Sequence, residues 1–205
     1  MSFLQDRAPD AGTESTANGS AARIGDWIQT FTGRMFWPLD PKPEEICIED
    51  VAHALSQMCR FMGHTNKFYS VAEHSIRVCW AVRERDALWG LLHDASEAYL
   101  VDLPRPLKRH SELGRLYCEA EKTVMAAVCV RFGLPLEEPA SVKLADAVLL
   151  ATEKRDLMKL PPKDWDQPAE PLEHVISPWS PELAENTFLS LFRGYSLLQR
   201  MAAER

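Results

Sequence analysis

In Leu91-Leu92-His93-Asp94-Ala95-Ser96-Glu97, an imidazole and a carboxylate lie side by side within an apolar stretch that has a helical pattern. A neutral imidazole nitrogen and a carboxylate oxygen are both good ligands for a divalent metal ion. A buried carboxylate without a partner is costly, so a cation is expected to compensate it. Taken alone, the dipeptide fits a buried hydrogen-bonded His–Asp pair as well as a metal site. Further ligands elsewhere in the chain would favour the metal site.

The chain around this stretch is dominated by helical periodicity. We expect a single all-α domain over residues 23–205, a bundle of about six helices at 49–60, 71–84, 87–100, 112–132, 142–159 and 181–201. The expected N-caps are Ser70, Asp86, Ser111, Ser141 and Ser180. Asp102-Leu103-Pro104-Arg105-Pro106 should end the third helix, because two prolines so close cannot lie in a helix interior. A small hairpin around Thr32-Gly33 is expected between Trp27 and Pro38.

Composition limits the class of protein. A chain of 205 residues with 46% hydrophobic residues suits one globular domain. Residues 1–22 lack an apolar segment and are expected to form a disordered tail, not a signal peptide. The net charge of −7 argues against a nucleic-acid polymer as partner. No apolar run reaches the roughly 18 residues of a membrane span. No two cysteines are spaced as a CxxC pair, so we expect a cytoplasmic protein with reduced thiols. The cysteines are Cys47, Cys59, Cys79, Cys118 and Cys129.

Two further helices can complete a ligand set around His93 and Asp94. Helix 71–84 carries His74 and is joined to the next helix by a short turn, so the two should pack as antiparallel neighbours. Asp146 lies in another apolar helix. Together these residues form a ligand set of two imidazoles and two carboxylates for a divalent ion. Mn²⁺, Co²⁺ and Zn²⁺ each accept such a set. Glu97 follows His93 by four positions and is placed for acid–base work.

Four blocks of sequence resemble a known family: Ser70-Val71-Ala72-Glu73-His74-Ser75, His93-Asp94-Ala95-Ser96-Glu97, Asp102-Leu103-Pro104-Arg105-Pro106-Leu107-Lys108, and Val142-Lys143-Leu144-Ala145-Asp146-Ala147. They resemble the HD-domain metal-dependent phosphohydrolases, in the branch of the bacterial 5′-deoxynucleotidases and the phage dATP triphosphohydrolases. The blocks fall within residues 60–150, whereas 1–45 and 160–205 carry no matching motif. The resemblance implies an HD-type helical bundle, a nucleotide substrate and a homo-oligomer.

The resemblance also implies roles for single residues. His74, His93, Asp94 and Asp146 would bind the metal ion, and Glu97 and Asp102 would be catalytic, Glu97 by handling a proton and Asp102 by contacting the sugar hydroxyl. The implied substrate-binding residues are Lys108, Lys143 and Arg60 for phosphate oxygens and Phe61 for the base. The spacing from Arg60 to His74 departs from that of the nucleotidases. His64, in a loop after Gly63, is a candidate for either a phosphate contact or a structural role.

Several functions remain open. A divalent ion lowers the pKa of bound water and neutralises phosphate charge, which suits release of phosphate from a deoxynucleoside monophosphate or of triphosphate from a deoxynucleoside triphosphate. The alternatives are a non-catalytic nucleotide-binding regulator with an HD fold and an HD hydrolase of a cyclic or alarmone nucleotide. The complete ligand set with Glu97 favours an enzyme, and the Asp102-Leu103-Pro104 block favours the nucleotidase branch.

Overall fold

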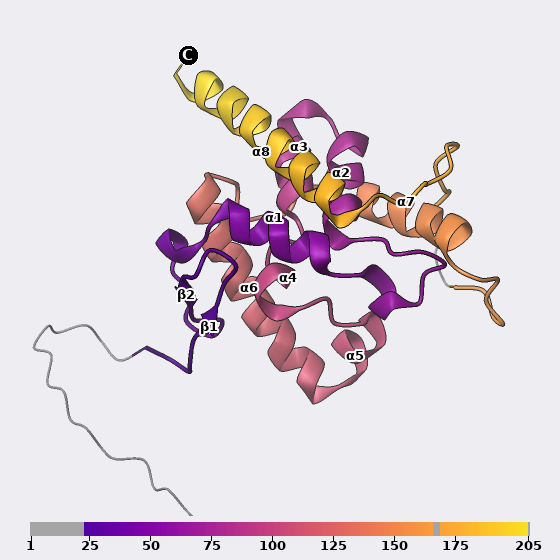
Figure 1. Ribbon diagram of the computed structural model, residues 1–205, viewed down its shortest axis with the longest axis horizontal. Coiled ribbons are helices and arrows are strands. Elements are labelled where there is room, and N and C mark those ends of the chain that lie inside the picture. The colour runs from indigo at the N-terminus through magenta and orange to yellow at the C-terminus, as the bar shows by residue number, and fades with distance from the viewer. Residues whose placement is uncertain (1–22, 166–168, 205) are drawn as a thin grey trace, which may run out of the picture.

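The computed structural model describes residues 23–165 and 169–204, so the tail expected at 1–22 lies outside the described residues. The expected all-α class is confirmed, because helices make up the body of the domain (Figure 1). They are α1 (Ile48–Gln57), α2 (Val71–Ala81), α3 (Glu84–Leu92), α4 (Glu97–Leu100), α5 (Arg105–His110), α6 (Glu112–Phe132), α7 (Ala140–Leu157) and α8 (Pro181–Ala203). Short 3-10 turns lie at Pro43–Glu45 (η1) and Arg60–Gly63 (η2).

The expected hairpin is present before α1. Strands β1 (Ile28–Gln29) and β2 (Met35–Phe36) pair antiparallel, with Ile28 opposite Phe36. Buried Asp50 of α1 fastens the turn, since its carboxylate accepts hydrogen bonds from the Thr32 backbone N–H at 2.6 Å and the Thr32 hydroxyl at 3.0 Å. The hairpin therefore packs on the bundle as an appendage of α1.

The expected helix 87–100 was wrong as a single element. The structure has two helices there, α3 and α4, separated by a turn at 93–96. Asp86 does not cap α3, which begins at Glu84 after Arg83, and Ser141 does not cap α7, which begins at Ala140 after Pro139. These two side chains bond to each other instead, the Ser141 hydroxyl donating to Asp86 Oδ2 at 2.7 Å. The pair ties the start of α3 to the start of α7.

The prolines after α4 break the helix as expected, but a further short helix follows them. In α5, Pro104 is the N-cap residue and Pro106 lies in the first turn, where a missing backbone N–H costs nothing. Three predicted serine caps are confirmed by hydrogen bonds from backbone N–H groups to Ser70, Ser111 and Ser180.

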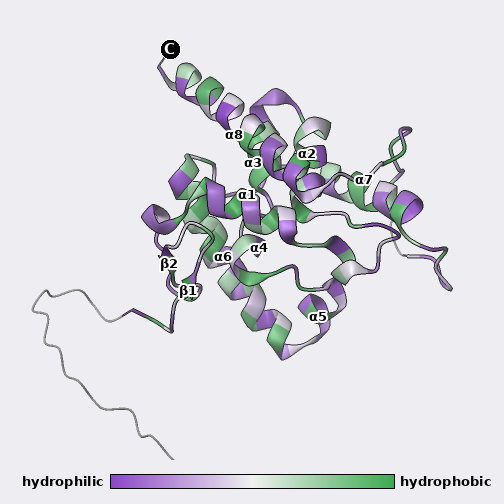
Figure 2. Ribbon diagram, in the orientation of Figure 1, coloured by the Kyte–Doolittle hydropathy of each residue, from purple (hydrophilic) through white to green (hydrophobic). Residues whose placement is uncertain are grey.

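Two apolar clusters form the core, and α2 contributes to both. Leu55, Ile76, Leu91 and Phe188 belong to the larger cluster, where α8 packs against α1, α2 and α3. The smaller one gathers residues of α2, α3, α6 and α7 around Leu149. Figure 2 shows hydrophobic and hydrophilic residues alternating along these helices. As a result, α2 lies between the two clusters, and its polar residues Glu73, His74 and Ser75 are buried with it.

Two sequence expectations concern the chain as a whole. All five cysteines are free thiols, as expected. Across residues 23–165 and 169–204, no helix combines the length and apolar character that crossing a bilayer requires.

Gly114 marks a close approach between α5 and α6. A Cβ at this position would collide with the backbone carbonyl oxygens of Leu107 and Lys108. We expect Gly114→Ala to lower the free energy of unfolding by about 1–3 kcal/mol, because α5 must shift to relieve the overlap. Urea denaturation measures the change. Gly194→Ala is the control, since an added methyl there meets no atom within 4 Å. Equal urea midpoints for the two variants would contradict the packing argument.

Candidate metal centre

The close packing of α2 against α3 brings the two histidines together. A Cβ on Gly90 of α3 would lie 3.3 Å from the Cα of Cys79 in α2, so the glycine permits a tight contact. His93 directly follows the last residue of α3, and its Nε2 atom lies 3.3 Å from Nε2 of His74 in α2. The antiparallel neighbours expected from the short connection are therefore present, and His74 reaches His93.

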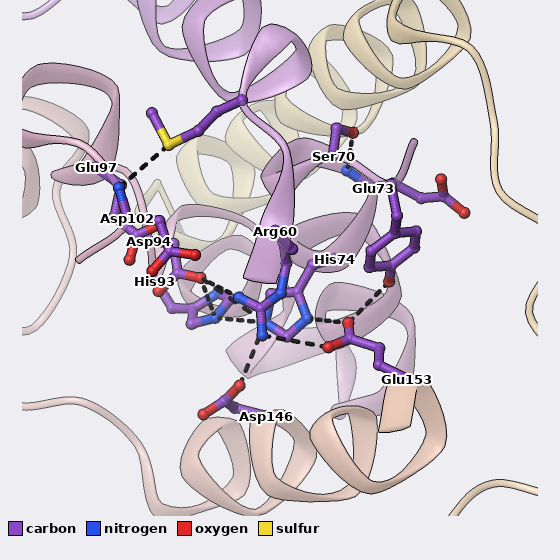
Figure 3. Close-up of polar contacts among 12 residues, drawn as sticks. Arg60, Ser70, Glu73, His74, His93, Asp94, Glu97, Asp102, Asp146 and Glu153 are labelled. Atoms are coloured by element: carbon purple, nitrogen blue, oxygen red, sulfur yellow. Dashed lines mark hydrogen bonds and ion pairs between the residues drawn. The ribbon is translucent and has the colours of Figure 1, made fainter. Parts of the chain in front are cut away.

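The two predicted carboxylates face the same nitrogens (Figure 3). Asp94 Oδ2 lies 3.2 Å from His93 Nε2 and 3.7 Å from His74 Nε2. Asp146 Oδ1, on α7, lies 3.3 Å from His74 Nε2. Among the described residues, His74, His93 and Asp94 form a group whose ligand atoms all lie within 4.8 Å of one another and which could hold a metal ion. Asp146 lies at the edge of that group.

Each imidazole is oriented through its other nitrogen. His93 Nδ1 lies 2.8 Å from the Gly90 carbonyl oxygen, which can only accept, so Nδ1 carries the proton. His74 Nδ1 lies 2.6 Å from Glu153 Oε1 in the same way. The Nε2 atoms therefore face the carboxylates, His93 Nε2 beside Asp94 and His74 Nε2 beside both Asp94 and Asp146. A proton or a metal ion at Nε2 can compensate the nearby carboxylates, and nitrogen and oxygen donors of this kind suit a first-row divalent ion.

The pKa shifts report the same demand for positive charge. Burial lowers the pKa of His93, but the carboxylate of Asp94 outweighs burial and raises that pKa to about 9. Burial raises the pKa of Asp146, yet its hydrogen bond to His74 brings the value down to about 2. Burial also raises the pKa of Asp94, but the charge and hydrogen bond of His93, with His74 and Arg60, hold it well below its usual range. The centre therefore keeps its carboxylates ionised and attracts a cation.

Arg60 reaches the centre from the turn η2. One of its guanidinium nitrogens lies 3.5 Å from Asp94 Oδ2 and another lies 3.2 Å from Glu153 Oε2. Phe61 and Met62 both have φ of 54° and Gly63 has φ of 81°. Two consecutive non-glycine residues in the left-handed region cost energy and mark a constrained turn. This turn places the Phe61 ring centroid 5.4 Å from the Arg60 guanidinium carbon.

Glu97, Asp102 and Lys108 lie on the other side of the centre. Figure 3 shows Glu97 and Asp102 beside Asp94. Glu97 is buried and its Oε2 has no hydrogen-bond partner, while Oε1 lies 3.6 Å from Lys108 Nζ. Burial, followed by the charges of Asp94 and Asp102, raises the pKa of Glu97 well above its ordinary value. Lys108 is also bound by Glu121 at 2.8 Å.

Lys143 and His64, two predicted phosphate-binding residues, have no described contact with the four proposed metal ligands. The Lys143 side chain is 61% exposed and pairs with Glu138 at 4.0 Å. His64 is exposed, and its backbone N–H donates to the Phe61 carbonyl. Both residues nevertheless neighbour site residues in sequence, since Lys143 precedes Asp146 by about one turn of α7.

Sequence reasoning missed Glu153 and Trp165. Glu153 is fully buried and follows Asp146 by two turns of α7, a spacing that puts both on one face. An acidic residue in an apolar helix was the available signal. Trp165, in the loop after α7, has its ring centroid 6.1 Å from that of Phe61. No local pattern indicated this contact.

The chain was compared with known proteins, and no family model matches it. It is 38% identical over 180 residues to the uncharacterized protein YfdR of Escherichia coli, a match that covers 86% of this chain and 99% of YfdR. It is also 41% identical over 128 residues to an uncharacterized protein of Rhodobacter capsulatus, covering 58% of this chain and 64% of that protein. Neither relative's name states an activity.

Proposed function

We propose that this chain, which belongs to the family of the Escherichia coli protein YfdR, is a metal-dependent phosphohydrolase that acts on nucleotides. The observation that carries the proposal is the convergence of His74 Nε2, His93 Nε2 and Asp94 Oδ2, with Asp146 Oδ1 beside them. The implied HD-domain membership rests on the same four residues and stays part of the proposal, as does the implied homo-oligomer.

A divalent ion held by these four residues would lower the pKa of a water molecule and neutralise charge on a phosphate group. Arg60 supplies the next positive charge, because its guanidinium group lies against Asp94 at the edge of the centre. Its N–H groups are suited to bind the non-bridging oxygens of a substrate phosphate. Lys108 offers a second cation on the side of Glu97.

Glu97 is the candidate proton donor. Because its pKa is raised well above the ordinary value, its carboxyl group carries a proton at higher pH than an exposed glutamate does. A buried acid of this kind can protonate the leaving oxygen of a phosphate ester. Asp102 lies beside Glu97 in Figure 3, and we assign it the contact with the hydroxyl of the departing sugar that the resemblance implies.

The aromatic residues beside Arg60 favour a nucleotide over a simpler phosphate ester. The Phe61 and Trp165 rings lie near each other, with their centroids 6.1 Å apart and their planes inclined at 42°. Bases stack on aromatic side chains with a gain of about 1–3 kcal/mol each. Since the Arg60 guanidinium lies between Phe61 and Asp94, a phosphate at the centre and a base at the rings match one nucleotide.

The charge balance favours a monophosphate. Each implied phosphate-binding cation already has a carboxylate partner: Arg60 pairs with Asp94 and Glu153, Lys108 with Glu97 and Glu121, and Lys143 with Glu138. A triphosphate would need further cations for its outer phosphates. We therefore propose deoxynucleoside monophosphates as the main substrates.

A substrate panel tests the proposal. Purified protein is incubated with deoxynucleoside mono- and triphosphates, cyclic and alarmone nucleotides and 2-deoxyribose 5-phosphate, with Mn²⁺, Co²⁺ or Zn²⁺. We expect orthophosphate from the monophosphates, complete loss of release with excess chelator, and recovery when the metal is restored. 2-Deoxyribose 5-phosphate should react at least about tenfold less efficiently, because it lacks the stacking base.

The remaining outcomes of the panel each reject part of the proposal. Triphosphate release from the triphosphates would assign the other reaction. Turnover of a cyclic or alarmone nucleotide alone would reject the nucleotidase branch. Nucleotide binding without turnover under every metal would reject an enzyme and favour a regulator.

A further inference from the structure

Glu153 joins two parts of the site that come from distant segments of the chain. The residue is fully buried, and both of its carboxylate oxygens are occupied (Figure 3). Oε1 accepts hydrogen bonds from His74 Nδ1 at 2.6 Å and from the Tyr69 hydroxyl at 2.9 Å. Oε2 accepts from a guanidinium nitrogen of Arg60 at 3.2 Å. One carboxylate thus contacts a metal-ligand histidine and the candidate phosphate-binding arginine.

The bond to His74 has a defined chemical effect. A carboxylate on Nδ1 fixes the tautomer and the ring orientation of a metal-binding histidine and makes its Nε2 a stronger donor. The fully buried His74 ring also contacts His93 and Asp146 through Nε2. Its position is therefore set from both sides, and Glu153 controls the side away from the centre.

The bond to Arg60 belongs to a closed ring of contacts. The Arg60 backbone N–H donates to the Tyr69 carbonyl at 2.9 Å. The side chains of Arg60 and Tyr69 then meet again on Glu153. Backbone and side chain of Arg60 are thus fixed against the same neighbour, which holds the guanidinium group beside Asp94.

We infer that Glu153 is a positioning residue that aligns the metal ligand His74 with the phosphate-binding Arg60. The Arg60 half of this inference rests on the proposed function, whereas the His74 half concerns metal binding alone. α7 therefore carries Asp146 as a ligand and, two turns later, the carboxylate that orients a second ligand.

Glu153→Gln is the direct test, because it keeps the size of the side chain and removes its charge. We expect the affinity for Mn²⁺, measured by equilibrium dialysis without substrate, to fall by about 10–100-fold. At saturating Mn²⁺, the KM for a deoxynucleoside monophosphate should rise by a larger factor than kcat falls, since Arg60 loses its anchor. Unchanged Mn²⁺ affinity together with unchanged KM would overturn the inference.

Glu73→Gln is the matched control. Glu73 is also fully buried and paired with an arginine, Arg77, at 2.6 Å, but its second oxygen accepts from the Trp179 backbone N–H. We expect this variant to keep the Mn²⁺ affinity of the wild type, because the Glu73 side chain has no described contact with the proposed ligands. Equal losses of affinity in the two variants would overturn the inference, because burial of a carboxylate would then explain both.

A second variant applies if Glu153→Gln does not fold. Tyr69→Phe removes one donor to Oε1 and leaves the carboxylate in place, so Mn²⁺ affinity should fall by a few-fold; unchanged affinity would overturn the inference. Wild-type protein that hydrolyses no nucleotide would refute the proposed function and the Arg60 half. Loss of Mn²⁺ affinity in Glu153→Gln would still support the His74 half, so the two failures remain distinguishable.

Discussion

His93→Ala is expected to lose the bound divalent ion and to lower kcat/KM for a deoxynucleoside monophosphate by about 1000-fold or more. The metal contributes several kcal/mol to phosphate hydrolysis, and each 1.4 kcal/mol is about a tenfold change in rate. His93 Nε2 lies 3.3 Å from His74 Nε2 and 3.2 Å from Asp94 Oδ2, so its removal takes away one of three converging ligand atoms. Metal content after dialysis and steady-state kinetics measure the two effects.

A second histidine variant separates loss of the metal from loss of an imidazole. His53 lies in α1, where its Nδ1 is 3.1 Å from Glu185 Oε2 and its ring centroid is 3.7 Å from that of Phe31. His53→Ala should keep both the metal and turnover. Mn²⁺ should raise the thermal midpoint of wild type and His53→Ala, because binding to the native state stabilises it, and leave that of His93→Ala unchanged. A His93→Ala variant that retains the ion and turns over substrate would refute the proposed centre.

Local patterns predicted most of the fold because they report burial and helix ends directly. Ser70, Ser111 and Ser180 were identified as caps, and each accepts a backbone hydrogen bond where expected. The turn at 93–96 was missed, because Leu92 to Ser96 contains neither glycine nor proline. In the turn, His93 bonds back to the Gly90 carbonyl while its ring meets His74 of α2, and a helical pattern of apolar residues does not report such contacts.

The proposed metal ligands could be predicted from the sequence, whereas the residues that support them could not. His74, His93, Asp94 and Asp146 are polar residues in apolar stretches, which marks them in the sequence. The supporting contacts of Glu153 with Tyr69 and His74 join residues 84 and 79 positions apart. Sequence spacing cannot reveal such pairs. Lys143 shares the motif with Asp146, yet its side chain is mostly exposed beside Glu138, so a motif position did not determine where the side chain lies.

Glu97→Gln is expected to lower kcat by about 100–10,000-fold, the range for loss of a general acid. The metal should remain bound, because Glu97 is not among the four proposed ligands. Glutamine keeps the shape of the side chain but cannot deliver a proton to the leaving oxygen. Glu121→Gln is the control: it removes the 2.8 Å partner of Lys108 without touching the proposed acid. It should stay within a few-fold of wild type in kcat, and equal losses in the two variants would assign the effect to Lys108.

The same substitution should stabilise the fold at neutral and alkaline pH. Burial, followed by Asp94 and Asp102, raises the folded-state pKa of Glu97 above its value of about 4.3 in an unfolded chain. The stability that depends on its proton is complete below the unfolded pKa and is lost as pH rises through the folded pKa. Glutamine does not ionise, so the free energy of unfolding of metal-free Glu97→Gln should not fall in this way. Its difference from the wild-type value, measured by urea denaturation, should therefore grow between pH 5 and 8. A constant difference across this range would show that Glu97 does not bind its proton more tightly in the folded state, and would remove the basis for its role as the acid.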